Sequence, residues 1–214
     1  MNRARNFWDK QAKKFDNSQK EFETASGEIM SRTKEYLDAD DNVLDFGCAT
    51  GTKTLELAGM IKHIHGLDFS SEMISEALKK KNEEKATNVS FSQGTIFSDD
   101  LDKASFEKIL AFSIIHLLEE CEKVIQRMYE LLKPGGLLIT ETACFSDRMN
   151  FKTRLEFTSY RFMKLLKLFP LNLNMFKTTD VEQLMSRQSF SILRSEKLFF
   201  NGMTISFIVA EKPR

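Results

Sequence analysis

The sequence predicts an α/β protein built on a mostly parallel β-sheet, and three observations support this prediction. Short apolar runs alternate with longer segments in which apolar residues recur three and four positions apart. Most runs end at a glycine or an acidic residue, as strands do where they enter loops at the edge of a parallel sheet. Two β-rich runs near the end of the chain flank Asn201-Gly202, a pair favoured in tight hairpin turns. One strand of that hairpin must therefore run antiparallel to the others.

Five parallel strands are expected before residue 142, each a short apolar run. Their ranges are Val43–Phe46, Ile61–Leu67, Val89–Ser92, Lys108–Ser113 and Leu137–Glu141. Amphipathic helices are expected between them, over Lys53–Ala58, Ser71–Lys81 and Leu117–Lys133. The last of these helices should stop at the Lys-Pro-Gly-Gly sequence of residues 133–136, because proline and glycine both interrupt helices.

The remaining elements frame this core. Two helices, Asn6–Asp16 and Ser18–Leu37, should cap one end of the sheet. After the fifth strand, the pattern predicts a helix closed by Pro170, a second helix and the two hairpin strands, over Asn150–Phe169, Thr178–Arg187, Phe190–Phe200 and Met203–Ala210. We interpret the chain as one domain with an N-terminal helical cap (1–40), a core (41–141), a second helical cap (142–188) and a closing hairpin (189–214).

Composition excludes several classes of protein. The 31 Lys and Arg residues balance 31 Asp and Glu residues, which argues against a protein that binds duplex DNA through excess positive charge. The cysteines Cys48, Cys121 and Cys144 are odd in number and irregularly spaced, which indicates free thiols. No signal peptide and no apolar run long enough to cross a bilayer is visible, so we expect a soluble, cytoplasmic protein without an integral membrane segment.

The neutral total hides two unlike segments. Residues 95–122 carry seven acidic and two basic residues, whereas residues 145–177 carry two acidic and seven basic residues. The second segment also holds six of the 19 phenylalanines. A basic, Phe-rich cap is therefore expected over one part of the domain.

The clearest local motif is the strand and small-residue loop of residues 43–52, Val-Leu-Asp-Phe-Gly-Cys-Ala-Thr-Gly-Thr. At the carboxyl end of a first parallel strand, such a loop lets backbone amides approach a ligand beside a helix N-terminus. Small residues stand at Gly47, Ala49 and Gly51, and Asp45 precedes them. An alternative interpretation is purely structural, with Asp45 capping the strand end and the glycines serving a tight turn.

This loop and four later motifs, in this order, resemble class I S-adenosylmethionine-dependent methyltransferases of the small-molecule branch. The four are His65–Met73, Gln93–Ile96, Phe106–Leu110 and Leu131–Gly136. The resemblance implies a three-layer Rossmann-like fold, with a seven-stranded sheet of order 3-2-1-4-5-7-6, one antiparallel strand and helices on both faces. It also implies S-adenosylmethionine as cofactor and S-adenosylhomocysteine as product.

The resemblance further implies a set of cofactor-binding residues. Asp68 would accept hydrogen bonds from both ribose hydroxyls, since one carboxylate can take two adjacent donors. Phe69 and Met73 would border the adenine, although apolar residues four apart on a helix also serve as core. The other expected contacts are Asp45, Gly47, Ala49, Gly51, Gly94, Thr95, Ile96 and Phe112. Two residues depart from the family pattern, because Ala49 replaces a glycine and Thr95 replaces an acid that would accept from the adenine amino group.

Methyl transfer from a sulfonium demands mainly that the acceptor be aligned and water excluded, and a base is needed only if the acceptor must lose a proton. His116, just beyond the fourth strand, is the candidate catalytic base, and the alternative is that it only lines the pocket. The Asn/Asp-Pro-Pro-aromatic motif of enzymes that methylate DNA bases is absent after that strand. His63 and His65 have no Cys or acid at ligand spacing, so no metal site is expected.

Residues on both caps are candidates for binding the acceptor. Trp8 and Phe15 belong to a segment similar to the entry helix of small-molecule methyltransferases, which covers the bound cofactor. A helical stripe of Phe151, Leu155, Phe162, Leu165, Leu166 and Phe169 should pack on the domain, leaving Phe157, Tyr160 and Arg161 toward the acceptor. This basic helix would be a lid over the acceptor, would rest on a membrane surface, or would simply be a packed helix with a solvated basic side.

These observations together predict a methyltransferase that acts on a small, apolar or amphiphilic acceptor. The alternatives are an enzyme that methylates protein or RNA through the basic segment 145–177, a non-catalytic cofactor-binding module, and a nucleotide-dependent oxidoreductase. The oxidoreductase is disfavoured because Thr52 stands where the G-x-G-x-x-G pattern of dinucleotide-binding proteins has its last glycine. The sequence does not define the acceptor, the methylated atom or the oligomeric state.

Overall fold

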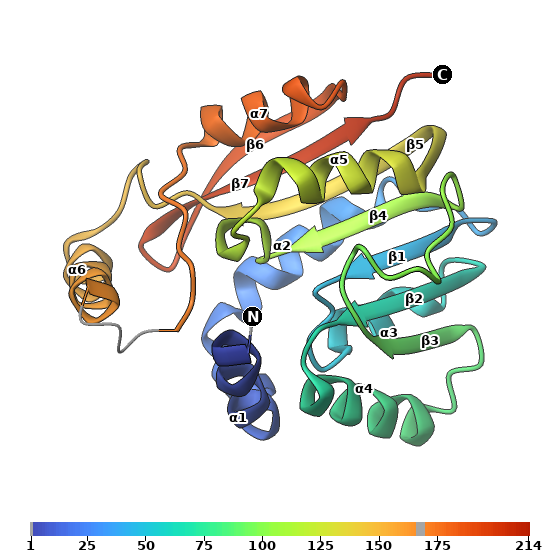
Figure 1. Cartoon of the computed structure of the whole chain (residues 1–214), viewed down its shortest axis with the longest axis horizontal. Coiled ribbons are helices and arrows are strands. Elements are labelled where there is room, and N and C mark those ends of the chain that lie inside the picture. Colours follow the sequence, from blue (N-terminus) through green and yellow to red (C-terminus); the bar gives the residue numbers. More distant parts are fainter. Residues whose placement is uncertain (1, 166–169) are drawn as a thin grey trace.

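A seven-stranded sheet forms the centre of the molecule, with helices over both faces (Figure 1). The computed structural model describes residues 2–165 and 170–214, apart from the side chains of residues 2, 156 and 161–165. The strand order is β3-β2-β1-β4-β5-β7-β6, so the predicted fold class and strand order are confirmed.

The strands are β1 (Asn42–Phe46), β2 (His63–Asp68), β3 (Val89–Gln93), β4 (Phe106–Phe112), β5 (Leu132–Ala143), β6 (Ser191–Phe200) and β7 (Met203–Glu211). Neighbours from β3 to β5 pair in parallel, and β7 pairs antiparallel with both β5 and β6. The carboxyl ends of β1, β2, β4 and β5 therefore meet along one edge, which is where open α/β sheets bind ligands.

The α-helices are α1 (Asn2–Gln19), α2 (Glu23–Lys34), α3 (Thr52–Ala58), α4 (Ser71–Glu84), α5 (Cys121–Leu131), α6 (Phe151–Leu165) and α7 (Thr178–Arg187). Two short 3-10 turns are also present: η1 (Lys20–Phe22) directly precedes α2, and η2 (Ile115–Leu117) lies between β4 and α5. The predicted break between the two N-terminal helices therefore falls a few residues later than expected. None of the described helices combines the length and hydropathy that crossing a bilayer requires.

Two hydrophobic cores cover the two faces of the sheet, and alternate strand residues supply them. On β5, Leu138 packs with residues of α5 and α7, whereas Ile139 packs with residues of α2 and α3. On β7, Ile208 belongs to the same core as Leu138, and Phe207 belongs to the same core as Ile139. This alternation follows from the two-residue period of a strand, and it makes the central strands apolar on both sides.

The predicted helix Leu117–Lys133 is wrong at both ends. A 3-10 turn precedes α5, which begins at Cys121, and β5 begins at Leu132 immediately after the helix. Leu132 pairs with Phe106 and Leu137 pairs with Lys108, so the intervening Lys-Pro-Gly-Gly sequence forms an irregularity within the strand pairing. Gly135 there has a φ of 79°. These residues therefore form part of a bulged strand instead of separating a helix from a strand.

The predicted packing stripe of α6 is also wrong in its described part. Phe151 is 83% exposed and Leu155 is 63% exposed, whereas Phe157 is 6% exposed. The helix start is fixed by Asn150, whose amide donates to the Gly202 carbonyl at 2.7 Å and whose side chain accepts from the Thr153 amide at 2.8 Å. These bonds turn the opposite face inward, and Figure 1 shows α6 standing apart from the sheet. The predicted Phe162, Leu165, Leu166 and Phe169 contacts and the helix end at Phe169 lie outside the described residues.

Candidate cofactor and acceptor site

The loop after β1 is held against the end of β2 by its backbone. The amides of Gly47 and Cys48 donate to the Leu67 carbonyl at 2.8 and 3.2 Å. Gly47 has a φ of 77° and Gly51 a φ of 74°, a region that L side chains rarely adopt, and Gly51 directly precedes α3. A Cβ at Gly51 would also lie 2.6 Å from the Phe91 ring. The predicted tight loop is therefore required by both conformation and space.

Asp68 joins this loop to the start of α4. One carboxylate oxygen accepts from the Ala49 amide at 3.0 Å, and the other accepts from the Ser70 amide at 2.9 Å. The Asp68 side chain is buried, and this burial raises its pKa. The Phe69 amide also hydrogen-bonds this carboxylate, which still has capacity to accept from a ligand hydroxyl. This arrangement fits the adjacent hydroxyls of a ribose.

Asp45 lies deeper than Asp68. It is 3% exposed, and it accepts from the Thr54 hydroxyl of α3 at 2.6 Å. Burial raises the pKa of Asp45 to about 6. Asp45 thus links the end of β1 to α3 through the Thr54 hydroxyl.

Asp45 should make stability pH-dependent. Its pKa is about 6 in the folded protein and 3.8 when exposed, so the folded state binds the proton more tightly. Its stabilising contribution is then complete below pH 3.8 and is lost as the pH rises through 6. Compared with Asp45→Asn, the wild-type free energy of unfolding should fall by on the order of 3 kcal/mol between those pH values. Urea unfolding of both proteins across this range measures the difference, and parallel curves would contradict it.

The remaining predicted adenine-side residues lie near the ends of β2 and β3. The Gly94 amide donates to the Asp68 carbonyl at 2.9 Å, and the Gln93 side chain donates to the Phe69 carbonyl at 3.2 Å. Met73 and Ile96 are each 1% exposed, and Ile96 belongs to the core beneath α5.

Thr95 and Phe112 have local partners of their own. The Thr95 hydroxyl accepts from the Phe97 amide at 3.3 Å, which leaves it bound within its own turn. Phe112 closes β4, is 7% exposed, and has the Lys53 ammonium 5.1 Å from its ring centroid. Both residues thus stand at the ligand-binding edge with a protein partner already in place.

The N-terminal helix α1 is tied across the glycine loop by two acidic side chains that the sequence interpretation missed. Asp16 accepts from the Thr50 hydroxyl at 2.6 Å and forms an ion pair with Lys80 at 2.6 Å. Asp9 accepts from the Ser70 hydroxyl at 2.6 Å. Burial opposes ionisation of Asp16, but the hydrogen bonds from Lys80 and Thr50 outweigh it and lower its pKa. This helix therefore covers the edge where the loop and α4 begin.

Trp8 and Phe15, the two candidates on α1, contact each other edge to face. Their ring centroids lie 6.2 Å apart, and both side chains are partly buried. The two rings thus form one aromatic surface on α1.

Asp16→Ala should release α1 from the loop. The change removes an ion pair and two hydroxyl contacts that span α1, the loop and α4, without touching the core. Amide hydrogen exchange of α1 should accelerate, while exchange of the β1 and β4 amides stays unchanged, because local opening precedes global unfolding. Mass spectrometry of peptides from both regions measures this difference. Asp180→Ala, which removes the acid that caps α7, is the matched control and should leave α1 exchange unaltered.

His116 occupies the acceptor side of the same edge. It lies in η2, is 9% exposed, and its Nδ1 has no hydrogen-bond partner within the described part of the chain. Burial lowers the pKa of His116 to about 4, so the ring is neutral at pH 7. Its ring meets Phe145 edge to face at 5.5 Å, and Phe145 stacks on Phe157 at 4.3 Å. These three rings form a continuous aromatic row.

Ser113 and Glu141 are a second pair that the sequence interpretation missed. Ser113 follows β4 with a φ of 52°, and its amide donates to the Glu141 carbonyl at 2.9 Å. Its hydroxyl donates to the Glu141 carboxylate at 2.5 Å. Ser113 is exposed, whereas Glu141 is 5% exposed. An acid at the end of a predicted buried strand, as also at Asp45 and Asp68, is the signal that could have found it.

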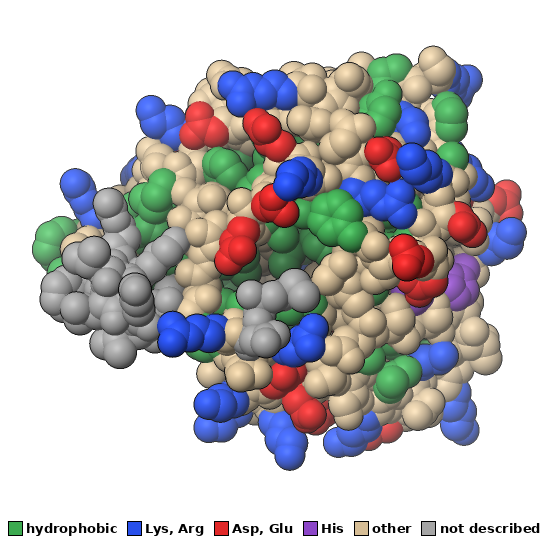
Figure 2. All heavy atoms as spheres, viewed as in Figure 1, with side chains coloured by type: hydrophobic (Ala, Val, Ile, Leu, Met, Phe, Trp, Pro, Cys, Tyr) green, Lys and Arg blue, Asp and Glu red, His purple; other side chains and the backbone are tan. Residues whose placement is uncertain are grey.

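Figure 2, in the view of Figure 1, shows a hollow beside the tip of β4 with hydrophobic side chains at its floor and acidic side chains on its rim. The candidate acceptor residue Tyr160 is 41% exposed on α6. Arg161 belongs to α6, but its side chain lies outside the described part of the structure.

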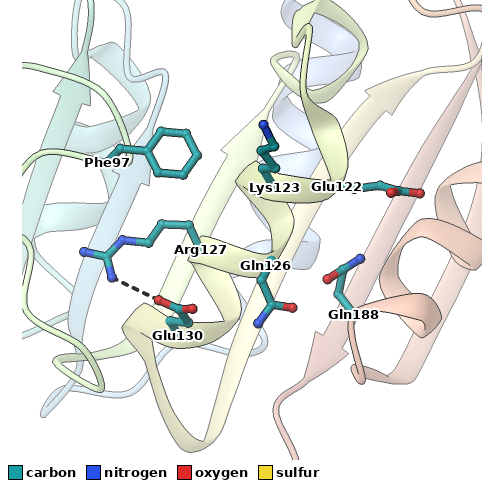
Figure 3. Close-up of a pocket in the computed structure, with 7 residues that line it drawn as sticks. All are labelled: Phe97, Glu122, Lys123, Gln126, Arg127, Glu130 and Gln188. Atoms are coloured by element: carbon teal, nitrogen blue, oxygen red, sulfur yellow. Dashed lines mark hydrogen bonds and ion pairs between the residues drawn. The ribbon is translucent and has the colours of Figure 1, made fainter.

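A shallow groove on the outer face of α5 is a separate feature (Figure 3). Its lining is Phe97, Glu122, Lys123, Gln126, Arg127, Glu130 and Gln188. Arg127 donates to the carbonyls of Ile96 and Leu101 at 3.3 and 2.7 Å, so it anchors the loop after β3. The groove is therefore explained by structural contacts of a charged helix face.

The histidines other than His116 and the cysteines do not point to further chemistry in the described structure. His65 contacts the hydroxyls of Ser90 and Ser92, each at 2.8 Å. Across the described residues, no three His, Cys, Asp or Glu side chains are grouped as a metal site would need. Burial raises the pKa of the Cys48 thiol well above its ordinary value, which keeps it protonated.

The sheet order and the glycine loop with Asp68 define the class of S-adenosylmethionine-dependent methyltransferases with a Rossmann-like fold. Residues 37–193 match the family model of a methyltransferase domain. The chain belongs to this methyltransferase family, class I.

Two curated relatives illustrate the similarity. Phosphoethanolamine N-methyltransferase 2 of Caenorhabditis elegans is 34% identical over 100 residues, which are 46% of this chain and 23% of that protein. Demethylmenaquinone methyltransferase of Lactococcus lactis is 31% identical over 101 residues, 46% of this chain and 40% of that protein. The matches thus span less than half of either relative.

A solved structure shares the fold over most of the chain. Phosphoethanolamine N-methyltransferase 2 of Haemonchus contortus, in complex with S-adenosylmethionine, superposes with a TM-score of 0.71. It is 17% identical, and the alignment covers 88% of this chain and 53% of that one. At this identity the comparison shows the fold.

Proposed function

We propose that the protein binds S-adenosylmethionine at the glycine loop and transfers its methyl group to a small, apolar or amphiphilic acceptor. The observation that carries this proposal is Asp68, whose two oxygens bind the Ala49 and Ser70 amides and so form one ligand-facing corner from the loop and α4. The family membership and the names of the relatives support it. Those names include acceptors as different as phosphoethanolamine and demethylmenaquinone, so they favour small molecules without selecting one.

Each part of the site has a task in this reaction. The bound cofactor would supply a methyl group on a positively charged sulfur, which leaves as a neutral thioether. Asp68 holds the ribose, and the positive-φ loop from Gly47 to Gly51 lets backbone amides approach the ligand. Helix α1, held by Asp9 and Asp16, excludes water from the reacting atoms.

His116 serves this reaction as a neutral wall of the acceptor pocket. A pKa of about 4 makes its ring a weak base at neutral pH. Its edge contact with Phe145 continues the aromatic row to Phe157, which provides apolar surface for the body of an acceptor. Trp8 and Phe15 from α1 and Tyr160 from α6 complete the proposed acceptor side; the predicted Arg161 side chain lies outside the described residues.

A second candidate function is methylation of a protein or an RNA. The observation that favours it is the exposed basic face of α6, where Lys152 and Arg154 flank the exposed Phe151 and Leu155. Such a surface would bind a polyanion with strong salt dependence. Competition for methyl transfer by RNA at rising salt therefore separates this function from the first.

Calorimetric titration with S-adenosylmethionine, followed by transfer of labelled methyl groups to a metabolite and lipid extract, tests the proposal. We expect one cofactor per chain and a labelled small molecule in the extract. Absence of cofactor binding would overturn the proposal. Cofactor binding with no labelled product would instead indicate a non-catalytic binding module, which contradicts the transfer step.

A further inference from the structure

Glu141 is a buried carboxylate with no positive partner among the described residues. It is 5% exposed, and its side-chain hydrogen bond comes from the neutral hydroxyl of Ser113. A buried carboxylate without a counter-charge is costly, because burial removes hydration that one hydroxyl replaces only in part. Its other lone-pair sites can accept further donors. The site therefore has the chemistry to receive a cation with N–H donors.

The position of Glu141 places it at the proposed acceptor side. Glu141 pairs with Phe112 on β4, and Leu110 two residues earlier pairs with Asp45 on β1. Glu141 therefore lies level with Gly47, two strands away. The spacing of adjacent strands puts the two residues about 10 Å apart. A small acceptor placed between the loop and β5 would span this gap.

The strand neighbours of Glu141 are two aromatic residues, Phe112 on β4 and Phe207 on β7. Each of these rings already has a cation of this chain near it, Lys53 at 5.1 Å from the Phe112 centroid and Arg194 at 5.9 Å from the Phe207 centroid.

Residues two apart on a strand share a face, so Glu141 points to the same side as Ala143. Ala143 packs with Phe145 and Phe157, and the Phe145 ring meets the buried ring of His116 edge to face. Aromatic faces attract organic cations, and apolar walls strengthen that attraction by excluding water.

The Ser113 backbone holds this pair in place at a conformational cost. A φ of 52° is unusual for serine, and the amide and hydroxyl of Ser113 both bind Glu141. Strain of this kind is maintained where the surrounding structure fixes a residue. Ser113 is also exposed, so it lies between the buried carboxylate and the protein surface.

We propose that the acceptor is an amine with an apolar body, and that Glu141, oriented by Ser113, binds its nitrogen. This inference rests on the proposed methyl transfer and names the chemical class of its acceptor.

The reaction balances with Glu141 as proton acceptor. An ammonium nitrogen donates an N–H to the carboxylate, and transfer of that proton to a Glu141 oxygen frees the nitrogen lone pair. The lone pair attacks the methyl carbon, so an N–C bond forms while the C–S bond breaks and its electron pair stays on sulfur. The products are a methylated ammonium and neutral S-adenosylhomocysteine. The proton on Glu141 then leaves to solvent past the Ser113 hydroxyl.

The test compares two matched probes on the protein saturated with S-adenosylhomocysteine. Calorimetry at pH 7.5 measures binding of 2-phenylethylammonium and of 2-phenylethanol, which differ in charge and share the apolar body. We expect the ammonium to bind about tenfold tighter or more, as a buried charge-assisted contact implies. Glu141→Gln, which keeps the shape and removes the charge, should reduce this preference to less than about twofold.

Two further variants separate recognition from folding. Ser113→Gly removes the hydroxyl and suits the positive φ, so it should fold and show a partial loss of ammonium preference. Glu119→Gln removes an exposed charge near the same edge and should leave the preference unchanged. Affinity for S-adenosylhomocysteine should stay the same in all three variants.

Several outcomes would overturn the inference. They are equal binding of the two probes, no measurable binding of the ammonium, and an ammonium preference that survives in Glu141→Gln. A fall in the affinity of Glu141→Gln for S-adenosylmethionine relative to S-adenosylhomocysteine would assign the carboxylate to the sulfonium and would also overturn it. Failure of the underlying proposed function looks different, because the wild-type protein would then bind neither cofactor form.

Discussion

Asp68→Ala should weaken binding of S-adenosylmethionine by about 100-fold or more. The substitution removes the acceptor proposed for the ribose hydroxyls, and charge-assisted hydrogen bonds contribute about 1.5–3 kcal/mol each. It also frees the Ala49 and Ser70 amides, which now converge on the two Asp68 oxygens. The loop and the start of α4 would lose their common anchor. Isothermal titration calorimetry measures the affinity directly.

Two controls make the Asp68 experiment specific. Asp40→Ala removes an exposed acid before β1, far from the carboxyl edge, and should bind the cofactor like wild type. Circular dichroism of Asp68→Ala should show an intact fold, because the Asp68 side chain belongs to neither of the two hydrophobic cores that cover the sheet. A folded Asp68→Ala protein with wild-type affinity would refute the proposed cofactor site.

Fold prediction succeeded where a local pattern corresponds to one structure. The apolar run Val43–Phe46 matches β1, and Asn201-Gly202 lies between β6 and β7. It failed at residues 133–136, where proline and glycines indicated a break. Whether such a sequence ends an element or bulges within it depends on the partner strand, here Phe106 and Lys108 of β4. That pairing is a tertiary choice that local sequence does not encode.

Helix α6 shows the same limit for side-chain packing. Its segment carries two apolar faces, and periodicity alone does not select between them. The selection comes from the Asn150 amide, which binds the Gly202 carbonyl 52 positions further along the chain. Phe157 consequently turns inward onto Phe145, and Phe151 remains exposed.

Some residues of the candidate site could be predicted from sequence motifs, and others are brought together only by tertiary contacts. Loop residues and Asp68 lie close together, as the ordered motifs suggested, because consecutive parallel strands bring their ends to one edge. Ser113 and Glu141 were missed because their contact joins two strands, and no spacing rule predicts a serine with positive φ. Asp16 was missed because its partner Thr50 lies on a different element.

Acidic side chains gather at the carboxyl edge of the sheet, and their environments differ. Burial raises the pKa of both Asp45 and Asp68, whereas Lys80 helps to lower that of Asp16. Glu141 stands two strands from the glycine loop with a neutral partner. Carboxylates on low-dielectric walls concentrate negative potential, which favours cationic ligands. A sulfonium donor and an ammonium acceptor both suit such an edge.

Gly51→Ala should be the most destabilising single-methyl change in the cofactor loop. Gly51 has a φ of 74°, and an added Cβ would lie 2.6 Å from the Phe91 ring and 3.0 Å from the Ala77 Cβ. Positive φ costs an L residue about 1–2 kcal/mol, and overpacking adds about 1–3 kcal/mol. We expect a loss of about 2–5 kcal/mol in the free energy of unfolding, measured by urea titration.

The two contributions can be separated because only one of them depends on Phe91. Phe91→Leu removes part of the ring that the new methyl of Gly51→Ala would meet. The free energy of unfolding of the double mutant should therefore fall by less than the sum of the losses in the two single mutants. The conformational cost should remain. Gly59→Ala, where no atom lies within 4 Å and φ is −69°, should retain wild-type stability or gain slightly. If Gly51→Ala were as stable as Gly59→Ala, the tight loop described for residues 47–51 would be incorrect.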